Sequence, residues 1–274
     1  MLCASSISYA YGDAEVLHDI DLRVEVGNLV GILGPNGSGK TTLLKLLAGL
    51  LTPTHGHVTL DGIEVTRCAR QEVAKRLAMV PQATELAFDY TAFDIVLMGR
   101  YPHLQAFELE GPSDINIVRR MLTLTGTSHL EDRTFRTLSG GEKQRVVLAS
   151  ALAQFDSGSS GTAEPTTNRV LLLDEPTSSL DLAFQLATAE LLGRLNESQA
   201  TTVVLCTHDL NLAAGLCREL VLLRDGKLVA AGEPAAVLTP ETVGAVFDVD
   251  VDIRCHPANG RVSVIPVARR ARPS

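Results

Sequence analysis

One short segment has the residue types and spacing of a phosphate-binding loop. The pattern GxxxxGK[ST] is filled by Gly34, Pro35, Asn36, Gly37, Ser38, Gly39, Lys40 and Thr41, and Thr42 follows. Its glycines allow consecutive backbone N–H groups to turn toward one anion, and the helix expected after it adds a positive N-terminus. Lys40 is long enough to reach the β- and γ-phosphates of a nucleotide, and the Thr41 hydroxyl can bind Mg²⁺. The alternative, an accidental glycine-rich turn, is disfavoured because every fixed position is filled between an apolar run and a leucine-rich stretch.

Two acidic residues follow a second apolar run. Asp174 and Glu175 come directly after residues 170–173, which read Val-Leu-Leu-Leu. A carboxylate at the carboxyl end of a buried parallel strand lies at the sheet edge where ligands bind. Asp174 can hold Mg²⁺ there, and Glu175 can polarise a water molecule. Alone, the pair could be an ordinary solvated strand end, but together with the glycine-rich loop it predicts a site for a nucleoside triphosphate.

A third motif combines serine, two glycines and a glutamate. Residues 138–145 read LSGGEKQR, so Ser139 can cap a helix and Glu142 can close a capping box. The N–H groups of such a helix start can also bind an anion. The string resembles the signature of ABC-type ATPases. The resemblance implies that this anion is the γ-phosphate of ATP bound by a second copy, so that two chains enclose two ATP molecules head to tail. Contacts in trans would come from Ser139, Gly140, Gly141, Glu142 and Asp181.

The same resemblance assigns roles to four further positions. Tyr11 is similar to the aromatic residue that stacks on adenine, although it could be an ordinary strand tyrosine. Gln82 resembles the glutamine that senses Mg²⁺ and γ-phosphate, and His208 resembles the histidine that contacts γ-phosphate. Residues 178–181 resemble the loop that crosses the dimer interface, and Ser179 could also cap the next helix. The implied catalytic residues are Glu175, His208 and Gln82; the implied ATP contacts are Tyr11, Gly34 through Thr42 and Asp174; the implied Mg²⁺ ligands are Thr41, Gln82 and Asp174.

Strands and helices alternate along the chain around the single glycine-rich loop. This order predicts an α/β fold with a mostly parallel sheet between helices. The resemblance implies a P-loop NTPase (RecA-like) core with a small antiparallel β subdomain and an inserted helical subdomain at about 88–155. We therefore expect an ABC ATPase domain over residues 1–246, and a short C-terminal β appendage and tail over residues 247–274.

Composition narrows the class of protein. The chain has 274 residues, of which 45% are hydrophobic, and its formal net charge of -8 argues against a nucleic-acid partner. Its five cysteines are scattered without a CxxC pair, which is typical of reduced thiols. No apolar run approaches the roughly eighteen residues of a membrane span, and the first residues lack a signal-peptide pattern. Any membrane role is therefore expected to come through a partner.

Three segments point to one branch of the family. Residues 99–103 (GRYPH), 205–214 (LCTHDLNLAA) and 247–267 resemble the ATPases of importers for ferric siderophores, haem and cobalamin. The resemblance implies a homodimer with ATP and Mg²⁺, bound to integral-membrane permease subunits at the cytoplasmic face of the membrane and served by an extracytoplasmic substrate-binding protein. For GRYPH, a structural turn at Pro102 is the alternative. We expect Arg100 to lie on the surface that receives the permease, so that its charge reversal spares ATP hydrolysis.

Other functions stay open at this point. The chain could be the ATPase of an ABC transporter for another substrate, or a soluble ABC ATPase that acts on ribosomes or DNA. A single cassette without basic excess counts against the soluble class. A degenerate subunit that binds ATP without hydrolysing it would need a broken motif, whereas Lys40, Asp174, Glu175 and His208 are all present.

The chain departs from the family pattern in two places. Ser139 and Asp174 are 35 positions apart, more than the family norm, and the polar segment 157–168 accounts for the excess as a tolerated surface insertion. Ser150 stands where the family usually has arginine, so the salt bridge that anchors this helix is expected to be missing.

Overall fold

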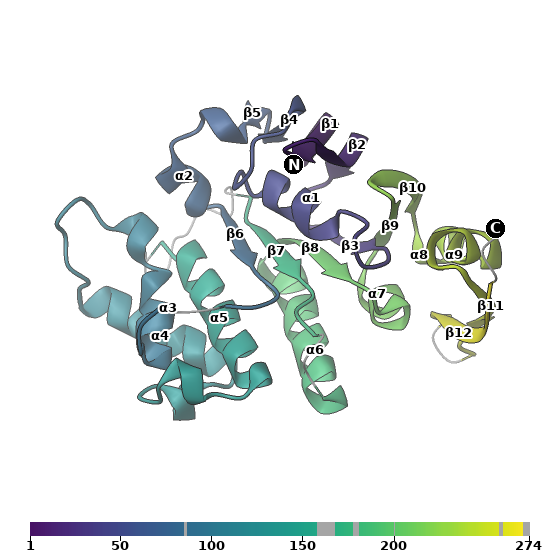
Figure 1. The fold of residues 1–274 in the computed structure, drawn as a ribbon. Helices are drawn as coiled ribbons and strands as arrows, with labels where there is room; N and C mark the ends of the chain where they lie inside the picture. Colours follow the sequence, from purple (N-terminus) through teal and green to yellow (C-terminus); the bar gives the residue numbers. More distant parts are fainter. Residues whose placement is uncertain (85–86, 158–167, 178–180, 200, 258–259, 271–274) are drawn as a thin grey trace. The chain divides into compact units, whose positions relative to one another are not determined.

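The computed structural model describes residues 1–84, 87–157, 168–177, 181–199, 201–257 and 260–270 (Figure 1). The chain divides into two compact units. Unit 1 combines Met1–Thr66 with Thr202–Ser274, and unit 2 is Arg67–Thr201.

Unit 1 begins with an antiparallel sheet in the strand order β2-β1-β4-β5. Its first two strands alternate buried apolar residues with exposed ones, as a sheet with one solvated face requires. The sheet is the small antiparallel β subdomain expected from the sequence. Its elements are β1 (Leu2–Tyr11), β2 (Ala14–Val24), β4 (His55–Leu60) and β5 (Ile63–Glu64), followed by η1 (Val65–Arg67).

The second sheet of unit 1 carries the glycine-rich loop. Strand β3 (Leu29–Leu33) is buried at every residue and runs parallel to both β8 (Thr202–Thr207) and β9 (Glu219–Arg224). A strand covered on both faces is expected to be a continuous apolar run, as here. Strand β3 leads through the loop into α1 (Lys40–Leu47), and β8 leads into α7 (Leu210–Leu216).

The last part of unit 1 is a chain of hairpins and short helices. Asp225 and Gly226 have φ of 47° and 71° and form the tight turn between β9 and β10. A second antiparallel hairpin follows, in which β12 packs on α7 and β11 packs on α9. Asn259 of its predicted turn lies outside the described residues, and the boundary at residues 246–247 stays a prediction. The elements are β10 (Lys227–Gly232), α8 (Pro234–Val237), α9 (Pro240–Phe247), β11 (Val249–Cys255) and β12 (Val262–Arg269).

Unit 2 holds two parallel strands and most of the helices. Strand β6 (Leu77–Val80) pairs in parallel with β7 (Val170–Asp174), whose residues are all buried. Helices α3, α4 and α5 pack against one another, which agrees with the helical pattern in the sequence (Figure 1). The helical elements are α2 (Arg70–Ala74), α3 (Ala92–Met98), η2 (Tyr101–His103), α4 (Pro112–Leu124), η3 (Ser128–Leu130), η4 (Phe135–Thr137), α5 (Gly140–Phe155) and α6 (Leu182–Gln199).

The GRYPH string closes the C-terminal end of α5. The Arg100 side chain is only 3% exposed and donates to Asp114 Oδ1 at 2.8 Å and to the Ala153 carbonyl at 2.7 Å, and it also bonds the Asp156 carbonyl. His103 Nε2 lies 2.8 Å from the Gln154 carbonyl. Cationic and N–H donors satisfy the carbonyls that a helix end leaves unpaired. The expectation that Arg100 lies on an exposed docking surface is therefore wrong.

Helix α5 is anchored to α3 without the missing arginine. The Ser150 hydroxyl donates to the Ile95 carbonyl at 2.8 Å. A Cβ on Gly99 would lie 2.2 Å from the Ser150 carbonyl oxygen, so only glycine allows the two helices to approach this closely. The hydrogen bond of Ser150 and the close approach at Gly99 thus take the place of the salt bridge that was expected to be missing. The insertion at 158–167 lies outside the described residues, and Asn168 just after it is buried.

We predict that Arg100→Glu strongly destabilises unit 2. The change leaves the carbonyls of α5 unpaired and places two carboxylates together, and breaking a buried ion pair typically costs about 3–5 kcal/mol. Arg119→Glu is the matched control, because Arg119 makes an exposed pair with Glu131 and such pairs contribute less than about 1 kcal/mol. Urea unfolding followed by circular dichroism compares the two, and equal midpoints would contradict the structural role of Arg100.

The ion pair between Arg100 and Asp114 makes the stability of unit 2 depend on pH. Burial raises the pKa of Asp114, but hydrogen bonds from Arg100 and from the Gly111 backbone outweigh it and hold this pKa below its ordinary value of 3.8. Because the folded-state pKa is depressed, the contribution of Asp114 is present above the ordinary value and is lost as pH falls through the folded-state value.

Candidate functional site

The glycine-rich loop of unit 1 surrounds a buried ammonium group. Lys40 is 6% exposed, and its Nζ donates to the carbonyls of Gly34 at 2.8 Å and Pro35 at 3.0 Å. Among the described residues, no carboxylate forms an ion pair with it. A buried charge needs a counter-charge, so the loop is built to receive an anion.

Two positions of the loop, Gly34 and Gly39, favour glycine because of their surroundings or their backbone conformation. A Cβ on Gly34 would lie 2.2 Å from the Leu223 carbonyl oxygen of β9, and Gly39, at the N-cap of α1, has a φ of 100°. The Ser38 hydroxyl is buried and has no hydrogen-bond partner within the described chain. A buried hydroxyl, an ammonium and the free N–H groups of a helix start fit phosphate oxygens. Thr41 is exposed at this helix start and Thr42 beside it is buried.

Two other predicted ATP contacts of unit 1 lie at strand ends. Tyr11, the last residue of β1, is half exposed and meets Tyr9 edge to face with ring centroids 4.9 Å apart. Its ring is thus supported on one side, while much of it is open to a stacking partner. His208 is exposed directly after β8, and Asp209 next to it caps α7 through the Asn211 and Leu212 N–H groups.

Unit 2 brings two predicted catalytic residues together. Gln82 Nε2 donates to Glu175 Oε2 at 3.1 Å. Glu175 has a φ of 48°, a left-handed conformation that costs a non-glycine residue roughly 1–2 kcal/mol and that occurs preferentially at functional sites. Asp174 lies buried at the carboxyl end of β7. The Asp174 and Glu175 carboxylates and the Gln82 amide therefore lie together at the carboxyl ends of β6 and β7.

The serine–glycine motif begins α5 as the sequence predicted. Ser139 is the N-cap, its hydroxyl accepts from the Glu142 N–H, and the Glu142 carboxylate accepts from the Ser139 N–H at 2.7 Å and its hydroxyl at 2.8 Å. These hydrogen bonds from Ser139 lower the pKa of Glu142. Ser139 and Gly140 are exposed, so this helix start is open to a ligand.

Among the described residues, Asp181 caps the start of α6. Asp181 directly precedes the helix, and its Oδ1 accepts from the Phe184 N–H at 3.0 Å, which is the bond of an N-cap residue. Ser179, which was predicted to cap this helix, lies with Ser178 and Leu180 outside the described residues. Asp181 itself is exposed, as a residue at an interface between two copies would need to be.

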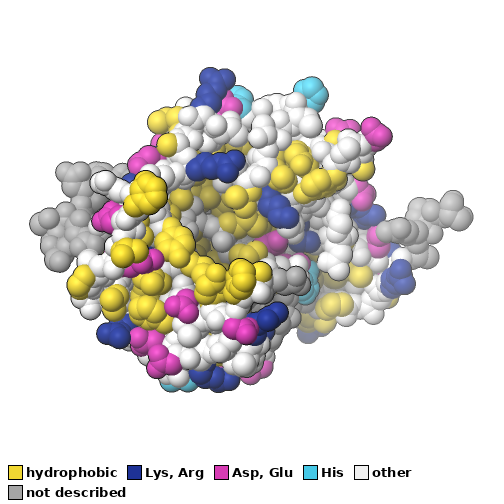
Figure 2. All heavy atoms as spheres, turned by 60° about the vertical axis from the view of Figure 1, so that its left-hand side comes forward, with side chains coloured by type: hydrophobic (Ala, Val, Ile, Leu, Met, Phe, Trp, Pro, Cys, Tyr) yellow, Lys and Arg dark blue, Asp and Glu magenta, His cyan; other side chains and the backbone are white. Residues whose placement is uncertain are grey.

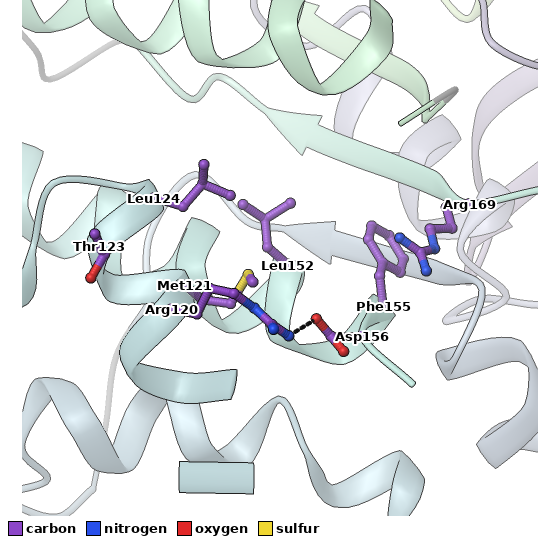
Figure 3. A pocket seen from close by; sticks show the side chains of 8 residues that line it. All are labelled: Arg120, Met121, Thr123, Leu124, Leu152, Phe155, Asp156 and Arg169. Atoms are coloured by element: carbon purple, nitrogen blue, oxygen red, sulfur yellow. Dashed lines mark hydrogen bonds and ion pairs between the residues drawn. The ribbon is translucent and has the colours of Figure 1, made fainter. Parts of the chain in front are cut away.

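A groove in unit 2 has no part in these motifs (Figure 3). It has a volume of about 510 Å³, and one wall is closed by an ion pair between Arg120 and Asp156. Its lining is Arg120, Met121, Thr123, Leu124, Leu152, Phe155, Asp156 and Arg169, none of which is a predicted site residue.

The predicted Mg²⁺ ligands offer the donors that this ion prefers. Thr41, Gln82 and Asp174 supply a hydroxyl, an amide carbonyl and a carboxylate, all hard oxygen donors. No group of three or more histidine, cysteine or acidic residues that could hold a metal occurs within the described residues. Taken singly, each of these oxygen donors suits Mg²⁺.

Comparison with known proteins decides the family. The model of the family described as ABC transporter matches residues 17–178, which contain the glycine-rich loop, LSGGEKQR and the acidic pair. The chain belongs to the ABC transporter family. This confirms the resemblance stated from the motifs and the α/β P-loop fold with its antiparallel β subdomain.

Individual relatives of this ABC ATPase are importer subunits. The cobalamin import ATP-binding protein BtuD of Halobacterium salinarum is 43% identical over 93% of the chain, which spans 61% of that relative's length. The hemin import ATP-binding protein HmuV of Gloeobacter violaceus is 42% identical over 97% of this chain and 94% of the relative. A solved ABC transporter of the metal-chelate type, in an inward-facing conformation, has a TM-score of 0.81 at 29% identity, covering 97% of this chain and 96% of its own. Within the described residues, no helix is both long and apolar enough to cross a membrane.

We predict that Lys40→Ala abolishes ATP binding. The variant leaves the phosphate charge without the buried ammonium, and dissociation constants measured with a fluorescent ATP analogue should rise by at least about a hundredfold. Lys45→Ala, near the other end of the same helix α1, is the control and should bind like the parent chain. Parent-like affinity of Lys40→Ala would contradict the assignment of the loop.

Proposed function

We propose that the chain is the ATP-hydrolysing subunit of an ABC importer that takes up a metal chelate through a separate membrane permease. The observation that carries the proposal is the buried Lys40 ammonium, which is bonded only to loop carbonyls within the described chain and lies beside the unpaired Ser38 hydroxyl. The intact acidic pair of unit 2, with Gln82 bonded to Glu175, adds the hydrolytic half.

In this proposal, the residues of unit 1 bind ATP in its ground state. Lys40 moves from its two carbonyls to the β- and γ-phosphates, which lie on the N–H groups of residues 34–42. Tyr11 stacks on adenine. Together these contacts set the affinity for ATP, because they are made before and during hydrolysis alike.

The residues of unit 2 and His208 act on the reacting phosphate. Glu175 accepts a proton from the attacking water, and the Gln82 amide, which already donates to Glu175, holds that carboxylate in place. His208 donates a hydrogen bond to the γ-phosphate, where negative charge shifts during transfer. Mg²⁺, when bound to Thr41, Gln82 and Asp174, would neutralise the negative charge of the phosphate oxygens.

The exposed start of α5 is suited to contact with a second copy of the chain. Ser139 and Gly140 are exposed at this helix start, where their backbone N–H groups and the serine hydroxyl lie. The Glu142 carboxylate beside them accepts hydrogen bonds from Ser139. We propose that this helix start, with Gly141, Glu142 and Asp181, contacts the ATP bound by the partner chain, which makes the active form a homodimer.

We infer the location of the chain, its partners and its cargo from its relatives. We propose a position at the cytoplasmic face of the membrane, permease subunits as partners and an extracytoplasmic substrate-binding protein for the cargo. Cobalamin and hemin are the cargoes in the names of the two relatives, and we propose a cargo of this kind or a ferric siderophore for this chain. We also propose the division into an ATPase domain at 1–246, with a helical subdomain at about 88–155, and an appendage at 247–274.

An exposed segment of unit 2 is suited to a partner. Hydrophobic side chains gather on the face shown in Figure 2. In unit 2, Tyr101, Phe107 and Leu109 are exposed within nine residues, and Phe107 is fully exposed. The Gln71 amide holds the start of this segment through the carbonyls of Pro102 and Leu104 at 2.9 and 3.0 Å. We propose that these side chains, in place of Arg100, contact the permease.

We predict that Glu175→Gln binds ATP but hydrolyses it at least about a hundredfold more slowly. The amide keeps the shape of the side chain and its contact with Gln82, yet it cannot accept a proton. The variant should also accumulate as an ATP-bound dimer in gel filtration. Glu190→Gln, an exposed glutamate of α6, is the control, and full activity of Glu175→Gln would exclude Glu175 as the base.

We predict that Phe107→Asp weakens assembly with the permease but leaves ATP hydrolysis by the free subunit within about twofold, since the side chain packs on nothing in unit 2. Co-purification with the permease and turnover of the isolated chain are measured in parallel. Leu50→Asp is the control, because Leu50 is an exposed leucine of unit 1. If both variants assemble like the parent chain, the segment is not the docking surface.

A further inference from the structure

The segment around His208 is short and is fixed on both sides. The Asp209 N–H donates to the Thr207 hydroxyl at 3.1 Å, so the residues that flank His208 are bonded to each other. The Asp209 carboxylate accepts from the N–H groups of Asn211 and Leu212, both at 2.9 Å. His208 is therefore carried by the start of α7, and its position depends on what holds that helix.

The side chain of Asn211 ties the start of α7 to the C-terminal hairpin. Its Nδ2 donates to the Val264 carbonyl of β12 at 3.1 Å, and its Oδ1 accepts from the Val264 N–H at 2.8 Å. One amide thus forms with one backbone residue the pair of bonds that a neighbouring strand would form. Val262 and Val264 are buried, and β12 packs on α7.

The hairpin is held independently at its other end. Arg224, the last residue of β9, donates to both carboxylate oxygens of Asp248 at 2.9 and 3.2 Å, and Asp248 directly precedes β11. Arg270 at the end of β12 donates to Asp250 at 2.6 Å. Paired guanidinium and carboxylate forks give a well-defined orientation.

Strand β9 also borders the glycine-rich loop. The Leu223 carbonyl lies so close to Gly34 that a side chain there would collide with it, and the Gly226 N–H donates to the Ser38 carbonyl at 3.2 Å. The hairpin therefore connects two parts of unit 1: the strand against the phosphate-binding loop and the helix that carries His208.

We propose that the β11–β12 hairpin braces the His208 segment against the phosphate-binding loop and that Asn211 is a positioning residue for His208. The inference rests on the role proposed above for His208. In this inference the C-terminal appendage has a structural role within unit 1. The two Asn211 hydrogen bonds limit the movement of α7 relative to β9.

The predicted effect is on turnover and not on affinity for ATP. Contacts from Lys40 and Tyr11 do not involve α7, so KM for ATP should stay within about twofold. Loss of a fixed His208 should lower kcat about tenfold, since small displacements of a transition-state contact are costly. Asn211→Leu removes both hydrogen bonds while keeping a side chain that branches at the same carbon, and Asn211→Asp keeps only the acceptor.

The test is a double-mutant cycle on the full chain with His208→Ala. Asn211→Leu should lower kcat in the parent chain and have no further effect in the His208→Ala chain, because the two residues act through one contact. A merely structural residue would lower kcat by the same factor in both backgrounds. Arg218→Ala, an exposed residue just after α7, is the control and should leave kcat unchanged.

Amide hydrogen exchange gives a readout without turnover. Asn211→Leu should accelerate exchange over residues 207–212 and at Val264, while exchange in the core of β3 stays as in the parent. Unchanged exchange over 207–212, or unchanged kcat in Asn211→Leu and Asn211→Asp, would overturn the inference. If His208→Ala alone leaves kcat unchanged, the role proposed for His208 fails instead, so the two failures are distinguishable.

Discussion

The buried ammonium of Lys40 is the constraint around which unit 1 is arranged. A charge that is 6% exposed and has only backbone carbonyls as partners within the described chain is stable when the surrounding dipoles hold it and an anion can reach it. Strand β3 delivers the loop at the edge of a parallel sheet, and the neighbouring strand β9 passes so near that Gly34 admits no side chain. The close packing of β9 and the loop is thus the condition for the ammonium to lie where phosphates bind.

A second constraint operates at α5 in unit 2. Its N-terminus is closed by the reciprocal bonds of Ser139 and Glu142, and its C-terminus by Arg100 and His103. The helix that presents LSGGEKQR is therefore fixed at both ends by side chains, and α3 touches its middle at Ser150. The cation and imidazole of GRYPH thus support the helix that carries the signature motif, and we propose the exposed side chains near and after this string as the partner-facing ones.

Much of this was predictable from the sequence, and the failures have a common physical cause. The loop at 34–42, the capping box at Ser139 and the strand before Asp174 were predicted because each is encoded by neighbouring residues. The position of Arg100 was predicted wrongly, because a charged residue after a helix looks exposed until its distant partners, such as Ala153, are known. Asn211 was not singled out at all. Its partner Val264 is 53 residues away and contributes only backbone groups, so the string 205–214 that contains Asn211 does not reveal this contact.

The two units also divide the chemistry in a way that suits a motor. Lys40 and Tyr11, which we propose to hold ATP in its ground state, belong to unit 1, whereas Glu175 and Gln82, which we propose to act in hydrolysis, belong to unit 2. In this proposal, ground-state binding and the chemical step rest on residues of different units, and only groups that gain interaction in the transition state accelerate hydrolysis. His208 is the exception, since it lies in unit 1 but is proposed to act on the γ-phosphate. We propose that it is supported within unit 1 by the β11–β12 hairpin, which Asn211 holds at one end and Arg224 at the other.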